Sequence, residues 1–136
     1  MSGNSLSCTA GVAALSHLRR HPEIYVDLDS KTDWLANEMR EIAARRGISC
    51  RINARHSIFS LNFTHRAAKF YRDKLAGSNF KATIALAYYM RKRGVYLPEL
   101  HSFLLSAAHT QEDLATIAFA FYKSLEEMLS DGLFVV

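Results

Sequence analysis

The stretch ISCRINARHSIFSLNF, residues 48–63, decides the fold, because its side chains alternate between apolar and polar. In residues 48–55 apolar or small side chains stand at every second position, and residues 58–63 repeat the pattern. Side chains two positions apart share one face of a strand, so both segments predict half-buried strands. The RHS between them, residues 55–57, is short enough for a turn or a bulge. The stretch therefore predicts two adjacent antiparallel strands.

Helical patterns surround this pair of strands. Residues 6–20 carry small and apolar side chains at spacings of three and four, with an alanine-rich face at Ala10, Ala13 and Ala14 that lets another element approach closely. A second helix is expected to begin near Ser30, as its N-cap, and to stop at 45–47. The other expected elements are a short helix within 64–79, a helix over 80–93, short strands at 95–97 and 103–107, and a helix from 111 onward.

This order of elements predicts an α+β fold, in which a small, mostly antiparallel sheet is faced by helices. With 136 residues, 49% of them hydrophobic, the chain can bury a core as one domain over 1–136, led by helix 5–20. No apolar run approaches the roughly 20 residues of a membrane helix, and the first residues do not form a signal peptide. We therefore expect a cytoplasmic protein, with Cys8 and Cys50 as reduced, buried thiols.

The formal charge of +4 raises the question of a nucleic-acid partner. The basic residues cluster at 18–22, 43–47 and 90–94, each time where a helix is predicted to end before Gly or Pro. Cations at that end stabilise the helix dipole by about 0.3–1 kcal/mol each. This placement favours helix ends over a nucleic-acid surface, and we expect no nucleic-acid partner.

The join between residues 103–107 and the last helix has its own local chemistry. Thr110 predicts an N-cap, and Asp113 stands where a capping box normally has Glu or Gln. His109 could act as a base, or it could bond the surrounding backbone; we favour the second role.

Motifs for independent catalysis are absent from the sequence. No nucleophile elbow, Walker loop, dinucleotide fingerprint or HExxH occurs, so we name no catalytic residue. His17 and His21 share one helical face, but no third ligand is close in sequence and we expect no metal site. The SGN at 2–4 heads a helix, where backbone N–H groups favour an anion, although an ordinary helix entry explains it equally.

Three segments, taken in order, resemble one enzyme family. SGNSLSCTAGVAAL at 2–15, GVYLP at 94–98 and FLLSAAHTQEDL at 103–114 are similar to the C-terminal part of the class III, fold type I aminotransferases, which use pyridoxal phosphate. The resemblance is closest to the glutamate-1-semialdehyde aminomutase branch and runs through nearly the whole chain. It implies the fold of that family's small C-terminal domain.

The resemblance also implies a part of an enzyme that is inert alone. In the family the Schiff-base lysine, the acidic partner of the pyridine nitrogen and the ring-stacking residue all precede the SGN segment. Pyridoxal phosphate would thus belong to the parent enzyme, and stable binding to this chain alone is not expected. Ser2, Gly3 and Asn4 would edge the cofactor site, and His101 stands where the aminomutases carry a glutamate near the substrate.

Two departures from the family bear on the helix entry and the substrate. Ser5 replaces a family proline, and Ser is a fair N-cap. The segment between Tyr96 and Ser106 is slightly shorter than in the aminomutases, and residues 97–110 look more like the aminotransferase domains of polyketide and peptide synthetases, whose acceptor is carrier-bound. A plain transaminase of unknown substrate is the other interpretation.

The sequence thus leaves two hypotheses for function. In the first, the chain is the C-terminal domain of an aminotransferase that moves an amino group to a keto or aldehyde acceptor, and its partner is the remainder of that polypeptide. In the second, it is a free-standing binding or dimerisation module with the same fold. A fragment without the large domain would leave the alanine-rich face exposed or paired with a second copy, so we expect a homodimer.

Overall fold

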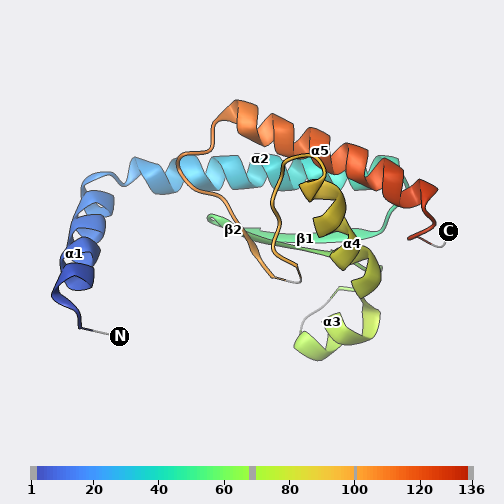
Figure 1. Ribbon diagram of the computed structural model, residues 1–136, viewed down its shortest axis with the longest axis horizontal. Coiled ribbons are helices and arrows are strands. Elements are labelled where there is room, and N and C mark those ends of the chain that lie inside the picture. The colour runs from blue at the N-terminus through green and yellow to red at the C-terminus, as the bar shows by residue number, and fades with distance from the viewer. Residues whose placement is uncertain (1–2, 68–69, 100, 135–136) are drawn as a thin grey trace.

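The computed structural model describes residues 3–67, 70–99 and 101–134. These residues form five helices and three strands (Figure 1), and the predicted α+β class is confirmed. In chain order the elements are α1 Ser5–Arg20, α2 Glu23–Arg45, β1 Cys50–Arg55, β2 Ile58–Phe63, α3 Tyr71–Gly77, α4 Phe80–Arg91, β3 Phe103–Leu104 and α5 Gln111–Ser130.

The sheet is antiparallel, with strand order β1-β2-β3. The register from Cys50 opposite Phe63 to Arg55 opposite Ile58 leaves two residues for the turn. The first of them, His56, has φ 51, a left-handed conformation in which histidine is more common than most residues. Its Nδ1 lies 2.9 Å from Asp29 Oδ1, so the turn is bonded to α2. The predicted hairpin is confirmed.

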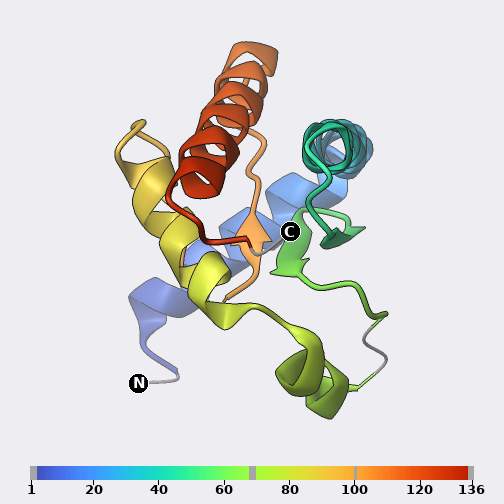
Figure 2. The same ribbon diagram turned by 90° about the vertical axis from the view of Figure 1, so that its right-hand side faces the viewer.

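One face of the sheet is covered by helices and the other is largely polar. Ile52, Phe59, Leu61 and Phe63 are buried on the covered face, as their alternation predicted. α2 packs on β1 and β2, and α4 packs on β2. α5 lies beside both helices, and Figure 2 shows it between α4 and α2, with α2 seen nearly end-on. Side chains without any exposed surface, including those of α2 and α5, form the centre of the core: Leu35, Leu114, Phe121, Leu125 and Met128.

The start of α2 differs from the prediction. The helix begins at Glu23, so Ser30 lies within it, and the Ser30 hydroxyl donates to the Val26 carbonyl at 3.0 Å instead of capping a first turn. The reason is Pro22, which ends α1 but has a φ of −64 that suits the beginning of a helix and needs no N–H partner there. Pro22 therefore both ends α1 and initiates α2.

The strands predicted around Pro98 are also mostly wrong. Residues 95–97 form no strand, and the pairing of 103–107 is limited to Phe103 and Leu104. The Val95 N–H donates to the Met90 carbonyl at 3.0 Å and so completes the C-terminal cap of α4. The segment is thereby held to a helix end, and it crosses the core with Leu97 buried and without a neighbouring strand.

α1 forms where the sequence predicted a helix, but it stands apart from the rest. Figure 1 shows it turning away from α2 at the blue end of the chain. None of its residues is buried, and Leu6 and Leu15 are 77% and 69% exposed. Cys8 is exposed as well, which corrects the expectation of a buried thiol, because α1 buries none of its residues. Within the described residues, no helix combines the length and the apolar character that crossing a membrane requires.

Candidate functional site

A cleft of about 530 Å³ opens between the segment after α4, strand β3 and the first turns of α5. Tyr96 and Pro98 line it from the first of these, Leu104 from β3 and Thr116 from α5. Tyr96 and Leu104 are 75% and 68% exposed, so large apolar surfaces face solvent at its mouth. The residues between 94 and 110 thus build most of the cleft.

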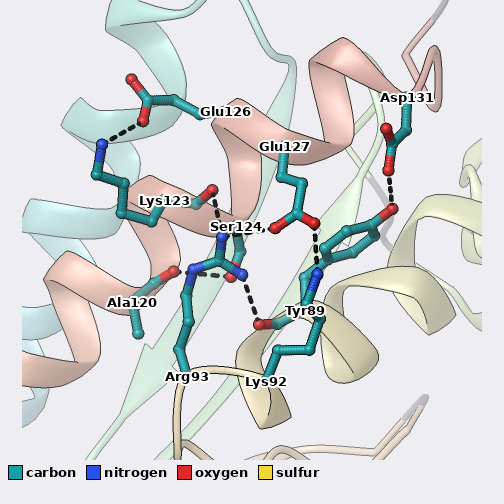
Figure 3. A network of polar contacts seen from close by, with 9 residues as sticks. All are labelled: Tyr89, Lys92, Arg93, Ala120, Lys123, Ser124, Glu126, Glu127 and Asp131. Carbon is teal, nitrogen blue, oxygen red and sulfur yellow. Dashed lines mark hydrogen bonds and ion pairs between the residues drawn. The ribbon is translucent and has the colours of Figure 1, made fainter.

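The beginning of this segment is fixed by Arg93, at the end of α4. Figure 3 shows its guanidinium between the two helices: it donates to the Tyr89 carbonyl at 2.9 Å, to the Lys123 carbonyl at 3.2 Å and to Glu127 at 2.6 Å. A hydrogen bond from Lys92 and then one from Arg93 hold the pKa of Glu127 below its ordinary value, so this carboxylate is ionised at neutral pH. The end of α4 is therefore bonded firmly to α5.

A left-handed glycine then directs the chain into the cleft wall. Gly94 has φ 78, a conformation that a side chain strains, and its N–H donates to the Arg91 carbonyl at 3.0 Å. With the Val95 bond described above, this fixes the direction of residues 95–98 as they leave α4.

The other end of the segment is fixed by the predicted capping box. The Thr110 N–H donates to Asp113 Oδ2 at 2.8 Å and the Asp113 N–H donates to Thr110 Oγ1 at 3.2 Å. The bond from the Thr110 backbone, followed by that from its hydroxyl, lowers the pKa of Asp113. The Ser106 N–H donates to His109 Nδ1 at 3.0 Å, which confirms the structural role favoured for this histidine.

A lysine from α2 also reaches this turn. Lys31 Nζ donates to the Ala107 carbonyl at 3.3 Å and lies 2.6 Å from Asp27 Oδ2. The His109 and Asp113 side chains line the cleft, where His109 Nδ1 accepts from the Ser106 N–H and Asp113 accepts from the Thr110 N–H. The described residues thus make a binding cleft with apolar walls, suited to contact with a ligand or a neighbouring segment.

Comparison with known proteins finds relatives that match most of this chain. No family model matches the chain. It is 31% identical over 139 residues to a glutamate-1-semialdehyde 2,1-aminomutase of Ruminiclostridium cellulolyticum, covering 98% of this chain and 30% of that protein. A second such aminomutase, from Bacillus cereus strain G9842, is 35% identical over 123 residues, covering 88% and 28%.

The chain is related to these aminomutases and corresponds to the C-terminal domain of an aminotransferase. Its fold agrees with solved structures: a transaminase with PLP bound has a TM-score of 0.80 at 23% identity, covering 95% of this chain and 28% of that one. A glutamate-1-semialdehyde aminomutase from Pseudomonas aeruginosa PAO1 has a TM-score of 0.71 at 18% identity, covering 78% and 24%. The chain therefore spans under a third of the length of the relatives it matches.

The site residues predicted from the family resemblance lie apart in this aminotransferase C-terminal domain. Ser2 is outside the described residues, and Gly3 is exposed with φ 96. The Asn4 side chain accepts from the Leu6 N–H at 2.9 Å, so Asn4, not Ser5, is the N-cap of α1. His101 is exposed beside the cleft, next to Ser102 in its lining. Figure 1 shows the start of α1 far from the segment that carries His101.

Two cleft residues were missed by the sequence analysis. Tyr96 was read as part of a strand, and Thr116 has no motif around it. Gly94 and Pro98, which flank residues 95–97, could have indicated that this segment is a connection, because such residues mark a short loop as readily as the ends of a strand.

None of the described lysines has the environment expected of a lysine that forms an imine with pyridoxal phosphate. An imine-forming lysine needs a lowered pKa, whereas the hydrogen bonds that Lys92 and Lys123 donate to Glu127 and Glu126 raise the pKa values of these lysines. Lys31 is paired with Asp27, and Lys81 is exposed on α4. Lys74 lies on α3, and Lys69 is outside the described residues. Cys50 offers no nucleophile either, since burial raises its pKa to about 12.

Proposed function

We propose that this chain serves as the C-terminal domain of a pyridoxal-phosphate-dependent enzyme that transfers an amino group to a keto or aldehyde acceptor. The observation that carries the proposal is the 31% identity that extends over 98% of the chain. The cleft supports it, because two of the three segments that resemble the family, 94–98 and 103–114, supply most of its lining. Glutamate-1-semialdehyde and a carrier-bound ketone remain the two substrate classes to be tested.

The domain's contribution would be binding and positioning, since its described residues do not fit the cofactor. We place the cofactor and the imine-forming lysine in the remainder of the polypeptide, the partner that this domain requires. The apolar walls of the cleft, with Tyr96 and Leu104 at its mouth, would exclude water beside the substrate. His101 would contact the substrate, and Ser2, Gly3 and Asn4 would edge the cofactor phosphate of an assembled enzyme.

A cytoplasmic location, one domain over 1–136 with helix 5–20 leading it, and assembly as a homodimer complete the proposal. The exposed Leu6, Val12 and Leu15 of α1 support a protein partner for that helix. The clustered helix-end cations support the absence of a nucleic-acid partner, since Arg46 and Arg93 are paired with Glu126 and Glu127.

A chimera tests the function. This chain replaces the matching C-terminal segment of the Ruminiclostridium cellulolyticum aminomutase, and cofactor absorbance and amino transfer to both substrate classes are measured. We expect cofactor binding and turnover, with His101→Ala raising KM while His65→Ala, at an exposed histidine outside the cleft, leaves KM unchanged. A folded chimera that binds the cofactor but turns over neither substrate class would contradict the proposal.

The isolated chain supplies a second test. After incubation with pyridoxal phosphate and reduction with borohydride, intact mass should show no single-site adduct. One stoichiometric adduct on one lysine would show that the chain carries its own cofactor site.

The alternative function is that of a free-standing dimerisation module. The lack of any buried residue in α1 favours it, because an amphipathic helix without cover tends to find a partner. Sedimentation distinguishes the two: a tight dimer of the isolated chain, together with an inactive chimera, would favour the module.

A further inference from the structure

Two histidines meet at the junction of α1 and α2. His17 lies in the last turn of α1 and His21 is its C-cap, and their ring centroids are 4.4 Å apart. The backbone joins the same pair, because the His21 N–H donates to the His17 carbonyl at 3.0 Å. Imidazole nitrogens bind Zn²⁺ at about 2.0–2.1 Å, so two rings this close can reach one ion from adjacent coordination positions.

A carboxylate orients the second ring. His21 Nδ1 lies 2.8 Å from Glu23 Oε1. An Nδ1–H that donates to a carboxylate leaves Nε2 with its lone pair free for a metal, which is the arrangement found around most metal-bound histidines.

We propose that His17 and His21 form a two-histidine chelate for a late first-row divalent cation such as Zn²⁺, with Glu23 orienting His21. Among the described residues, no group of three or more His, Cys, Asp or Glu could hold a metal ion, so water completes the coordination. Such a site is open and exchangeable, unlike a closed structural zinc site. Imidazole suits Zn²⁺, Ni²⁺ and Cu²⁺ better than Mg²⁺ or Ca²⁺.

The surroundings permit the ion and give it a local effect. Arg19 and Arg20 are the nearest cations in sequence, and Arg20 Nε is engaged by the Ser16 carbonyl at 3.1 Å, while Glu23 supplies a compensating negative charge. An ion bound by both rings would link His17 to His21 in addition to their backbone hydrogen bond. It would therefore fix the orientation of α1 relative to α2. The inference concerns this chain alone and does not rest on the proposed amino transfer.

The test is calorimetric titration of the 136-residue chain with ZnCl₂ at pH 7.5, repeated at pH 5.5 and with MgCl₂. We expect one Zn²⁺ per chain, loss of binding at pH 5.5 because protons compete for the imidazoles, and no binding of Mg²⁺. Glu23→Gln should weaken Zn²⁺ binding about 10- to 100-fold. His17→Ala should weaken it by at least as much, because it removes a ligand.

His65→Ala is the matched control, since it removes an exposed histidine elsewhere and should leave the affinity unchanged. Circular dichroism confirms that each variant keeps its helices. Equal Zn²⁺ affinity in the wild-type chain and in His17→Ala would overturn the proposal, as would the absence of a saturable site.

Discussion

Helices α1 and α5 have similar apolar patterns but differ in how much of their surface is buried. They span 16 and 20 residues, and each carries apolar side chains at spacings of three and four. α5 buries Leu114, Phe121 and Leu125 completely, whereas α1 buries no residue. An amphipathic pattern thus predicts that a helix has an apolar face, but the surface that covers the face has to be present elsewhere. For α1 no described element supplies it.

The largest test of this contrast is the same truncation in both helices. Leu125→Ala removes a side chain with no exposed surface and should lower the unfolding free energy by about 2–5 kcal/mol, through lost burial and the cavity left behind. Leu15→Ala, at 69% exposure, should change it by less than about 0.5 kcal/mol. Urea unfolding followed by circular dichroism measures both, and comparable losses would mean that α1 packs on the body in solution.

The next largest effect is expected at Arg93, which joins the end of α4 to α5 beside the cleft. Arg93→Met removes three hydrogen bonds, two of which join the end of α4 to α5, and should cost about 1.5–3 kcal/mol. Arg45→Met breaks an exposed pair with Glu41 within α2 and should cost about 0.3–0.5 kcal/mol. Thermal unfolding of both variants compares the two arginines. Equal melting temperatures would show that the α4–α5 bonds do not stabilise the fold.

A smaller effect is expected from acid. Hydrogen bonds, first from Lys123, lower the pKa of Glu126 from 4.5 to about 2. Because the folded value is the lower one, this group stabilises the fold above pH 4.5, and its contribution declines as pH falls toward 2. Glu126→Gln should therefore make stability less dependent on pH between 4.5 and 2. High salt should flatten the wild-type profile in the same direction, and an unchanged slope in the variant would contradict the assignment.

Sequence predicts best where local pattern and tertiary contacts agree. The hairpin over 48–63, the stripe of α5 and the box of Thr110 and Asp113 follow from rules that act within a few residues. The failures are of another kind. Residues 95–97 have the composition of a strand, but pairing needs a neighbour, and the Val95 N–H is already bonded to α4.

The cleft was less predictable than the fold, because it is assembled from contacts distant in sequence. Lys31 reaches the Ala107 carbonyl, and Arg93 reaches α5, and neither bond has a local signature. The resemblance to the aminomutases located the segments of the cleft, while the orientation of Tyr96 required the structure. A family motif thus indicates which segments matter before geometry shows how they meet.

The smallest effect on stability is expected from removing α1 altogether. Among the residues that the structure describes, a chain that begins at Pro22 loses no buried side chain, so at low protein concentration its unfolding free energy should match that of the full chain within about 0.5 kcal/mol. Association provides the contrast: if α1 pairs two copies, the full chain's melting temperature should rise with concentration, because binding stabilises the folded state, and the shortened chain's should not. A large loss of stability at low concentration would mean that α1 belongs to the core. If the melting temperatures of both chains rise equally with concentration, the dimer interface lies elsewhere, and α1 is expected to contact the rest of the polypeptide.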